Sequence, residues 1–328
     1  TFNENQASLA VFGDGQNMED MNLRTWTDRC SGGRRKIVPA SGNNHIKDGV
    51  IKVNIDTSSS SRRSHDKVRD NMVRAVQSKL GIDDLSSKFD HVMLCTPQQT
   101  TGIYTAYAWK NYHLSVYYHN WCRSPSVQLH ELGHNINLDH SGQNGIEYDD
   151  ETGLMGYSDE RFDGPKMCFN PAKNWRLGWY DVGSQALSFD PLTHGSKTVR
   201  LKGVADFDPD KTDDAQVVVR LASDNPGINN RNDQGIYLGF NRAKGPNVGT
   251  AEERNKVLIV RDDGLDEFDL GTRSSLLKGL SYGHEWRLDN YSNSGRDLII
   301  KWWGYDHGPQ VSVYFNRCER DTDCDYLR

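Results

Sequence analysis

The segment LHELGHNINLDHSG, residues 129–142, places three histidines and one glutamate within eleven positions. Residues four apart share one face of an α-helix, so His130 and His134 can both present a ring nitrogen to one ion, with Glu131 close beside them. Ser124 suits the N-cap and Pro125 the first helical position. The sequence therefore predicts a helix that begins at about residue 125 and carries the first two histidines.

A third histidine completes the pattern only if the chain turns back after that helix. A catalytic zinc site needs three protein ligands and an open position, and His140 is the candidate for the third. Asn137 lies where the turn must fall, and asparagine enters the left-handed backbone region more readily than most residues. We expect one Zn²⁺ at His130, His134 and His140; the alternative is a helix with three surface histidines and no metal.

A methionine follows in a tight-turn context. GLMGYS, residues 153–158, places Met155 fifteen residues after His140. A methionine turn beneath three histidines is the second mark of the metzincin metalloproteases. Met155 would then form an apolar floor under the metal site and would not be a ligand; the alternative is an ordinary core methionine.

The histidine pattern and the methionine turn together resemble those of the metzincins. A wider set of segments is similar to the gametolysin family of secreted algal metalloproteases. The position that is usually glycine in metzincins is Asn137 here. The resemblance covers roughly residues 10–180 and continues more weakly beyond them. It rests on the segments FGDG, CSGG, DHVMLCTP, WCRSPSVQLHELGHN, LMGYS and MCFNPAKNWRLGWY.

The resemblance implies a secreted zinc endopeptidase acting on proteins or glycoproteins of the cell wall or extracellular matrix. Zn²⁺ would polarise the scissile carbonyl and lower the pKa of its bound water. Glu131 would take the proton of the attacking water and pass it to the leaving amine. Tyr157 matches a tyrosine that stabilises the oxyanion in some metzincins, although a buried tyrosine packed on the turn explains it equally well.

Peptide substrates of such an enzyme are expected to bind in extended form along an edge strand. The candidate is GIYTAYAW, residues 102–109, with Thr105, Ala106 and Tyr107 nearest the cleft; the alternative is an interior strand. Residues 89–96, 113–121 and 45–56 are predicted as further strands, and residues 66–81 as a surface helix ended by Gly81.

The residue pattern of the sequence changes at about residue 185. From there, short β-branched and aromatic runs alternate with Gly, Asn, Asp and Pro clusters, a pattern typical of an all-β sandwich. We therefore predict an α/β (α+β) metzincin-like catalytic domain with a mixed sheet and an active-site helix at residues 1–183, and a β-sandwich accessory domain at 184–328. The predicted strand runs lie at residues 197–204, 215–223, 234–242, 255–263, 285–290, 297–305 and 310–316.

Charge and hydropathy restrict the partners. The net charge is −6 and the basic residues are scattered, which argues against a nucleic-acid partner. No run approaches 18 apolar residues, so no membrane span is expected. The acidic segments 206–214 and 262–269 are candidates for Ca²⁺, but the first has Lys211 where an EF-hand loop needs Gly, so we expect solvated turns.

The chain has six cysteines, an even number that suits disulfides in an extracellular protein. A bond between Cys122 and Cys168 would join the two segments of the metal site, with Cys30–Cys95 and Cys318–Cys324 completing the set. Cys30 could instead be a thiolate that binds the zinc and keeps the enzyme in an inactive, latent form.

The alternative function is a matrix- or cell-surface-binding protein with a vestigial zinc site. The intact His130, Glu131, His134 and His140 disfavour it.

Overall fold

The computed structural model describes residues 3–15, 21–58, 64–98, 100–101, 105–157, 166–181, 185–211, 213–222, 235–266 and 269–316. Two compact units divide the chain. The first comprises Thr1–Arg29, Gly33–Asp139 and Ser158–Lys166, and the second Cys30–Gly32, His140–Tyr157 and Met167–Arg328.

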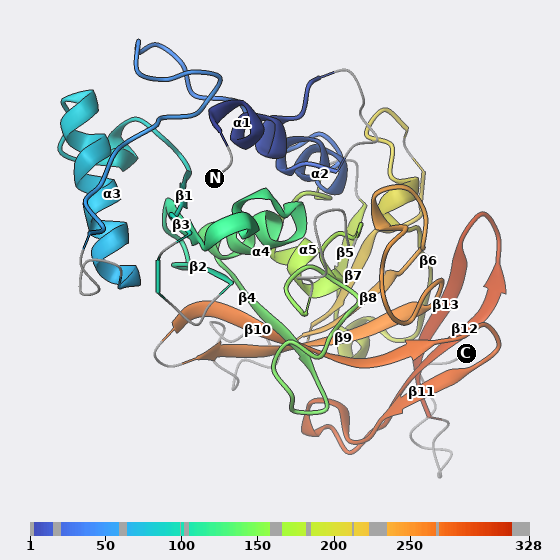
Figure 1. The fold of residues 1–328 in the computed structure, drawn as a ribbon. Helices are drawn as coiled ribbons and strands as arrows, with labels where there is room; N and C mark the ends of the chain where they lie inside the picture. The colour runs from blue at the N-terminus through green and yellow to red at the C-terminus, as the bar shows by residue number, and fades with distance from the viewer. Residues whose placement is uncertain are drawn as a thin grey trace. The chain divides into compact units, whose positions relative to one another are not determined.

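The first unit contains four α-helices and a three-stranded sheet in the described residues (Figure 1). The strands have the order β1-β3-β2, with β1 parallel and β2 antiparallel to β3. The helices are α1 (Glu4–Phe12), α2 (Leu23–Cys30), α3 (His65–Leu80) and α4 (Pro125–Asn135), and the strands are β1 (Val92–Cys95), β2 (Ala106–Ala108) and β3 (Leu114–Tyr117).

Side chains alternate between the two faces of this sheet, as a strand requires. Leu94, Leu114 and Val116 pack with residues of α3 on one face. On the other face, Tyr117 packs with Cys122 and Val127 at the start of α4. Figure 1 shows α3 and α4 on either side of the strands. The sheet is therefore the platform against which the histidine-bearing helix lies.

The second unit is mostly β-structure. A six-stranded sheet has the order β4-β10-β9-β8-β7-β5, and a four-stranded sheet the order β11-β12-β13-β6. Their strands are β4 (Leu138–Gln143), β5 (Ala186–Phe189), β6 (Lys197–Arg200), β7 (Val218–Leu221), β8 (Ile236–Phe240), β9 (Val257–Asp266), β10 (Asp269–Leu280), β11 (Glu285–Leu288), β12 (Leu298–Tyr305) and β13 (Pro309–Phe315). Two short helices, α5 (Pro171–Leu177) and α6 (Pro191–His194), complete it.

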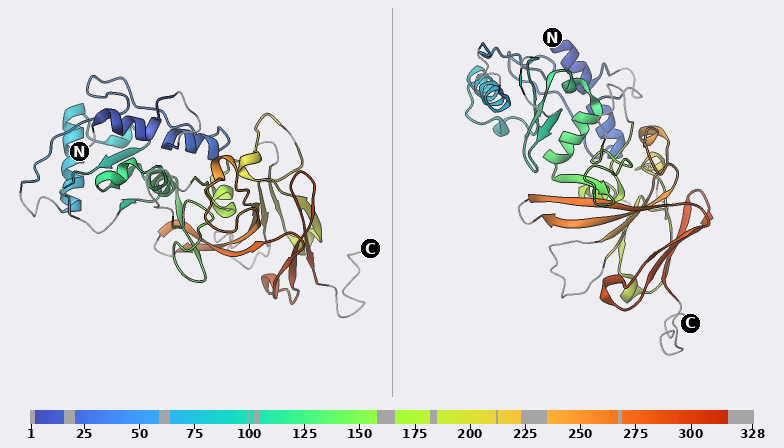
Figure 2. Two further views of the ribbon diagram at one scale, coloured as in Figure 1. Left: turned by 45° about the vertical axis from the view of Figure 1, so that its right-hand side comes forward. Right: turned by 60° about the horizontal axis from the view of Figure 1, so that its bottom comes forward.

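One apolar core joins these two sheets. Leu238 and Ile259 of the larger sheet belong to the same buried cluster as Ile300 and Val313 of the smaller one. A second cluster, on the opposite face of the larger sheet, includes Ala172 of α5. Figure 2 shows both sheets from two further directions. The protein thus has a mixed α/β architecture with several mixed sheets and few helices.

Several local predictions are confirmed. Gly81 ends α3 in the left-handed conformation, with φ 67°. All seven predicted β runs after residue 185 contain a strand. The three strands predicted between residues 89 and 121 are present as β1, β2 and β3, each shorter than its run.

Other predictions were wrong. Residues 45–56 form no strand and contain only an isolated bridge between Lys47 and Val50. The acidic segment 262–269 is no simple turn, because its described residues extend the antiparallel pair β9 and β10. The described residues of the segment 206–214, by contrast, are mostly turn or irregular and largely exposed, as expected. There Asp213 forms an ion pair with Lys202 at 3.0 Å, and Asp214 pairs with Arg200.

The disulfide pairing also differs from the expected one. Cys30 is bonded to Cys168 and Cys95 to Cys122. Cys30 is therefore not a free thiolate, and the expected pairs Cys122–Cys168 and Cys30–Cys95 are wrong. Cys318 and Cys324 lie outside the described residues. The reason is tertiary: Cys95 ends β1 and Cys122 precedes α4 on the same face of the small sheet, which brings their sulfurs together.

Peptide mapping under non-reducing conditions should yield the pairs Cys30–Cys168 and Cys95–Cys122. Replacing Cys30 and Cys168 together by Ser should lower the free energy of unfolding by about 2–4 kcal/mol, because that bond closes a long loop in the unfolded chain. The matched double variant at Cys95 and Cys122 opens a shorter loop and should lose less. Recovery of a Cys122–Cys168 peptide would contradict this connectivity.

Candidate metal centre

Helix α4 begins where its sequence requires. Ser124 is the N-cap, with an extended backbone, and Pro125 occupies the first turn. Most of the helix is buried, including Glu131 and His134. At its other end, the backbone amides of Asn111 and Asn137 both donate to the carbonyl of His134, at 3.0 and 2.9 Å. The end of the helix is therefore fixed by the β2–β3 connection as well as by its own turn.

Asn137 makes the turn that the pattern needs. Its φ is 70°, in the left-handed region, as expected from the sequence. Strand β4 starts at the next residue. Just before His140, the buried carboxylate of Asp139 accepts from the ammonium of Lys110 at 2.6 Å. The turn at Asn137 and this ion pair therefore lie directly before His140.

The three histidines form a cluster. One ligand atom from each of His130, His134 and His140 lies within 4.8 Å of the other two. All three belong to one continuous segment, α4 and β4, whose local turn brings them together. Within the part of the chain that the structure describes, this is the one group of His, Cys, Asp or Glu side chains with the geometry to hold a metal ion.

Two of the histidine rings are oriented by hydrogen-bond acceptors. His134 Nδ1 lies 2.9 Å from the carbonyl oxygen of Leu138, and His140 Nδ1 lies 2.6 Å from a carboxylate oxygen of Glu147. A carbonyl or carboxylate oxygen can only accept, so Nδ1 is the donor in each pair. That tautomer leaves Nε2 as the coordinating atom, which is the usual arrangement of metal-binding histidines.

Glu147 is a site residue that the sequence analysis missed. Besides His140, it contacts the guanidinium of Arg273 at 3.2 Å. The ring of Tyr148, the next residue, stacks on His140 with 4.0 Å between centroids. Four acidic residues occur between positions 147 and 151. Which of these four acids faces His140 depends on the tertiary fold, so the sequence alone could not identify Glu147.

Glu131 is buried without a partner for one of its oxygens. Its side chain is only 5% exposed, and no described group donates to Oε2. Burial raises the pKa of Glu131 from 4.5 to about 8. A buried carboxylate is costly unless a positive charge compensates it. The donor set of three histidines and the orphaned carboxylate oxygen on the same helix fit a bound cation such as Zn²⁺.

The turn that contains Met155 is hydrogen-bonded to β4. Met155 is fully buried, and its carbonyl accepts from the amide of Ser141, the residue after His140, at 2.8 Å. Gly156 packs so closely on the Asp150 carbonyl that a Cβ would not fit. Tyr157 is 54% exposed, and its amide donates to the Tyr148 carbonyl. Tyr157 is therefore not a buried packing residue, the alternative raised by the sequence.

The predicted substrate-binding residues lie at the edge of the small sheet. Ala106 and Tyr107 belong to β2, which pairs with β3 alone among the described strands. The Thr105 carbonyl accepts from the amide of Tyr118 at 3.1 Å, which extends this pairing. Tyr107 is partly buried against Trp109, with 5.2 Å between the ring centroids.

Comparison with known proteins decides the family. A family model described as gametolysin peptidase M11 matches residues 4–267. The chain belongs to the gametolysin family. No curated protein and no solved structure gave a match. Membership makes the chain a metallopeptidase with a protein substrate, and together with the histidine cluster it indicates a zinc site. None of the described helices is long and apolar enough to span a bilayer.

Replacing Glu147 by Ala should weaken Zn²⁺ binding by about 10–100-fold, because His140 loses the acceptor that fixes its tautomer and ring orientation. Glu147→Gln keeps an acceptor oxygen and should lose less. Competition with a zinc-binding dye measures the affinity directly. Glu285→Ala, at an exposed glutamate of β11, is the matched control. Equal affinity of Glu147→Ala and the control would show that Glu147 does not support the ligand.

The metal-free protein should become less stable as the pH rises from 4.5 to about 8. Folded Glu131 stays protonated up to a pKa of about 8, whereas the unfolded chain releases this proton near the ordinary value. The unfolded state binds fewer protons in this window, so the free energy of unfolding falls with pH, on the order of a few kcal/mol in total. Urea titrations of chelator-treated protein measure this effect, and Glu131→Gln should remove it. If the free energy of unfolding depends on pH in the same way in the parent and in Glu131→Gln, the raised pKa of Glu131 is contradicted.

Proposed function

We propose that the chain is a secreted zinc-dependent endopeptidase that hydrolyses extracellular or cell-wall glycoproteins, with Glu131 as general base. One observation carries the proposal: in a chain of a metallopeptidase family, a buried carboxylate without a partner for one oxygen lies on the helix that presents two of three clustered histidines. Such a set of side chains has the chemistry for water activation and no evident structural purpose.

His130, His134 and His140 would hold the ion. Zn²⁺, when bound, supplies a Lewis acid that polarises a carbonyl and acidifies water. Glu131 takes a proton from the attacking water and returns it to the nitrogen of the leaving amine. Its buried position keeps competing water from solvating the carboxylate, which makes it a stronger base once it is ionised. No covalent enzyme intermediate is required.

Tyr157 and β2 would act on the substrate. Tyr157, whose side chain is half exposed, would donate to the oxyanion that develops on the scissile carbonyl. Thr105, Ala106 and Tyr107 would bind the peptide backbone, because an edge strand offers main-chain donors and acceptors to an extended chain irrespective of its sequence. Met155 would support the ligands from below, and Asn137 would position His140.

The larger architecture is part of the same proposal. We infer a metzincin-like catalytic domain at residues 1–183 and a β-sandwich accessory domain at 184–328. The shared apolar core between the six-stranded and four-stranded sheets supports the sandwich. Two disulfides support an oxidising, extracellular compartment, since cytosolic thiols are kept reduced.

Replacing Glu131 by Gln should reduce casein or gelatin hydrolysis by about 10²–10⁴-fold, the usual contribution of a general base, while the zinc content stays at one ion per chain. Glu285→Gln, at an exposed glutamate of β11, is the control and should keep full activity. Zinc in both the parent and the Glu131 variant, with no cleavage of any protein by either, would contradict the proposal and favour the matrix-binding alternative.

A further inference from the structure

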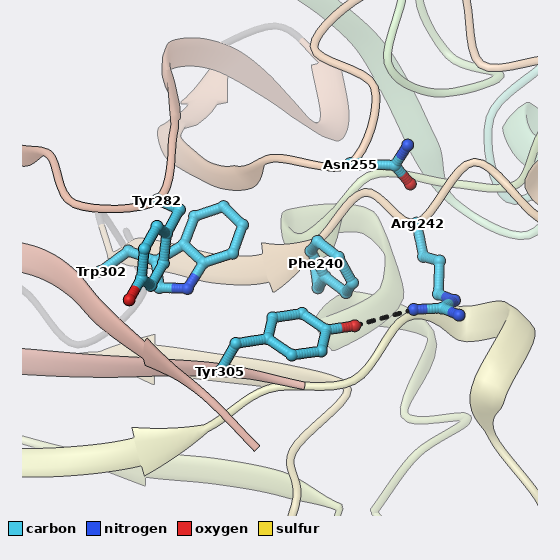
Figure 3. Close-up of a pocket in the computed structure, with 6 residues that line it drawn as sticks. All are labelled: Phe240, Arg242, Asn255, Tyr282, Trp302 and Tyr305. Atoms are coloured by element: carbon cyan, nitrogen blue, oxygen red, sulfur yellow. Dashed lines mark hydrogen bonds between the residues drawn. The ribbon is translucent and has the colours of Figure 1, made fainter. Parts of the chain in front are cut away.

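An open pocket lies in the second unit, apart from the residues assigned to the metal centre. Its volume is about 360 Å³. Phe240 ends β8, Trp302 and Tyr305 belong to β12, and Tyr282 lies between β10 and β11. Arg242 and Asn255 come from the connection between β8 and β9, and Figure 3 shows all six side chains around the pocket. No part of the proposed proteolysis uses these residues.

Aromatic rings form the floor and part of the rim of this pocket. Phe240 and Trp302 are 8% and 5% exposed, and their rings contact each other edge to face with 6.0 Å between centroids. Tyr282 and Tyr305 are 61% and 52% exposed. Exposed aromatic side chains gathered around a concavity are typical of ligand sites, because leaving them in water has no structural benefit. The pocket therefore offers fixed apolar faces to a ligand.

Polar groups complete the rim opposite two of the rings. In Figure 3, Tyr282 and Trp302 lie on one side, Arg242 and Asn255 on the other, with Phe240 and Tyr305 between them. The guanidinium of Arg242 donates to the hydroxyl of Tyr305 at 2.9 Å. The amide oxygen of Asn255 accepts from the amide of Ala243 at 3.0 Å. These contacts hold planar hydrogen-bonding groups in place before any ligand binds.

The pocket is close to electrically neutral. Arg242 is the only charged residue among the six that line it, and its Nε lies 3.1 Å from a carboxylate oxygen of Asp206. An anionic ligand would have to compete with Asp206, and a cationic one would meet the guanidinium. The complementary ligand is therefore uncharged, with apolar faces for the rings and hydroxyls for the polar rim.

We propose that this pocket binds a neutral sugar residue of a glycan. A sugar ring presents C–H groups on its flat faces, which the negative faces of aromatic rings attract, and hydroxyls around its edge. Asn255 and the Arg242–Tyr305 pair would bind those hydroxyls. A proline-rich peptide also favours aromatic surfaces, so the test below includes one. The proposal does not depend on the protease assignment.

The full chain is titrated with methyl glycosides of neutral hexoses, of pentoses and of N-acetylglucosamine. Saturation-transfer NMR and tryptophan fluorescence measure the binding. At least one glycoside should bind saturably. Tyr282→Ala should weaken that binding by about tenfold or more, as for the loss of a central aromatic contact, and Tyr282→Phe should retain most of it. Tyr282 is exposed enough for the fold to persist in both variants, which thermal unfolding verifies.

Trp303→Ala is the matched control. Trp303 is 48% exposed and lies on β12 beside Trp302, but it does not line the pocket; its indole donates to Ser312. The control should bind the glycoside like the parent. The proposal is overturned if no glycoside binds saturably, if Tyr282→Ala binds as well as the parent, or if decaproline binds at Tyr282 and no sugar does.

Discussion

The left-handed turn at Asn137 is the constraint on which the metal centre depends. A helix can present His130 and His134 to one ion, but it carries every later residue away along its axis. With φ at 70°, Asn137 ends the helix within one residue, and β4 then returns His140 to the other two histidines. The carbonyl of His134, bonded to the amides of Asn111 and Asn137, holds the turn in place.

The surroundings of the ligands then determine their chemistry. Leu138 and Glu147 accept from the Nδ1 atoms of two histidines, which leaves Nε2 of each as the atom that would bind the ion. Glu131 has the opposite environment, since burial deprives one of its oxygens of any donor and raises its pKa. A buried carboxylate with a raised pKa beside a histidine cluster is a suitable arrangement for removing a proton from water. Ligand orientation and base strength thus have separate physical origins.

The sequence predicted those features that depend on residues close together in the chain. The start of α4 at Pro125, the turn at Asn137, the end of α3 at Gly81 and the strand runs of the β-rich region all follow from caps, turn preferences and side-chain periodicity. Contacts between distant residues were not accessible in this way. The pairing of Cys30 with Cys168, the ion pair between Lys110 and Asp139, and the choice of Glu147 among four neighbouring acids all depend on tertiary packing.

We propose that His130, His134 and His140 together bind one zinc ion, each through a ring nitrogen. X-ray absorption at the zinc edge of the zinc-loaded protein tests this coordination most directly, because it reports the type, number and distance of the ligands. We expect three imidazole nitrogens and one further oxygen at about 2.0–2.1 Å. Sulfur at about 2.3 Å, or fewer than three imidazoles, would contradict it.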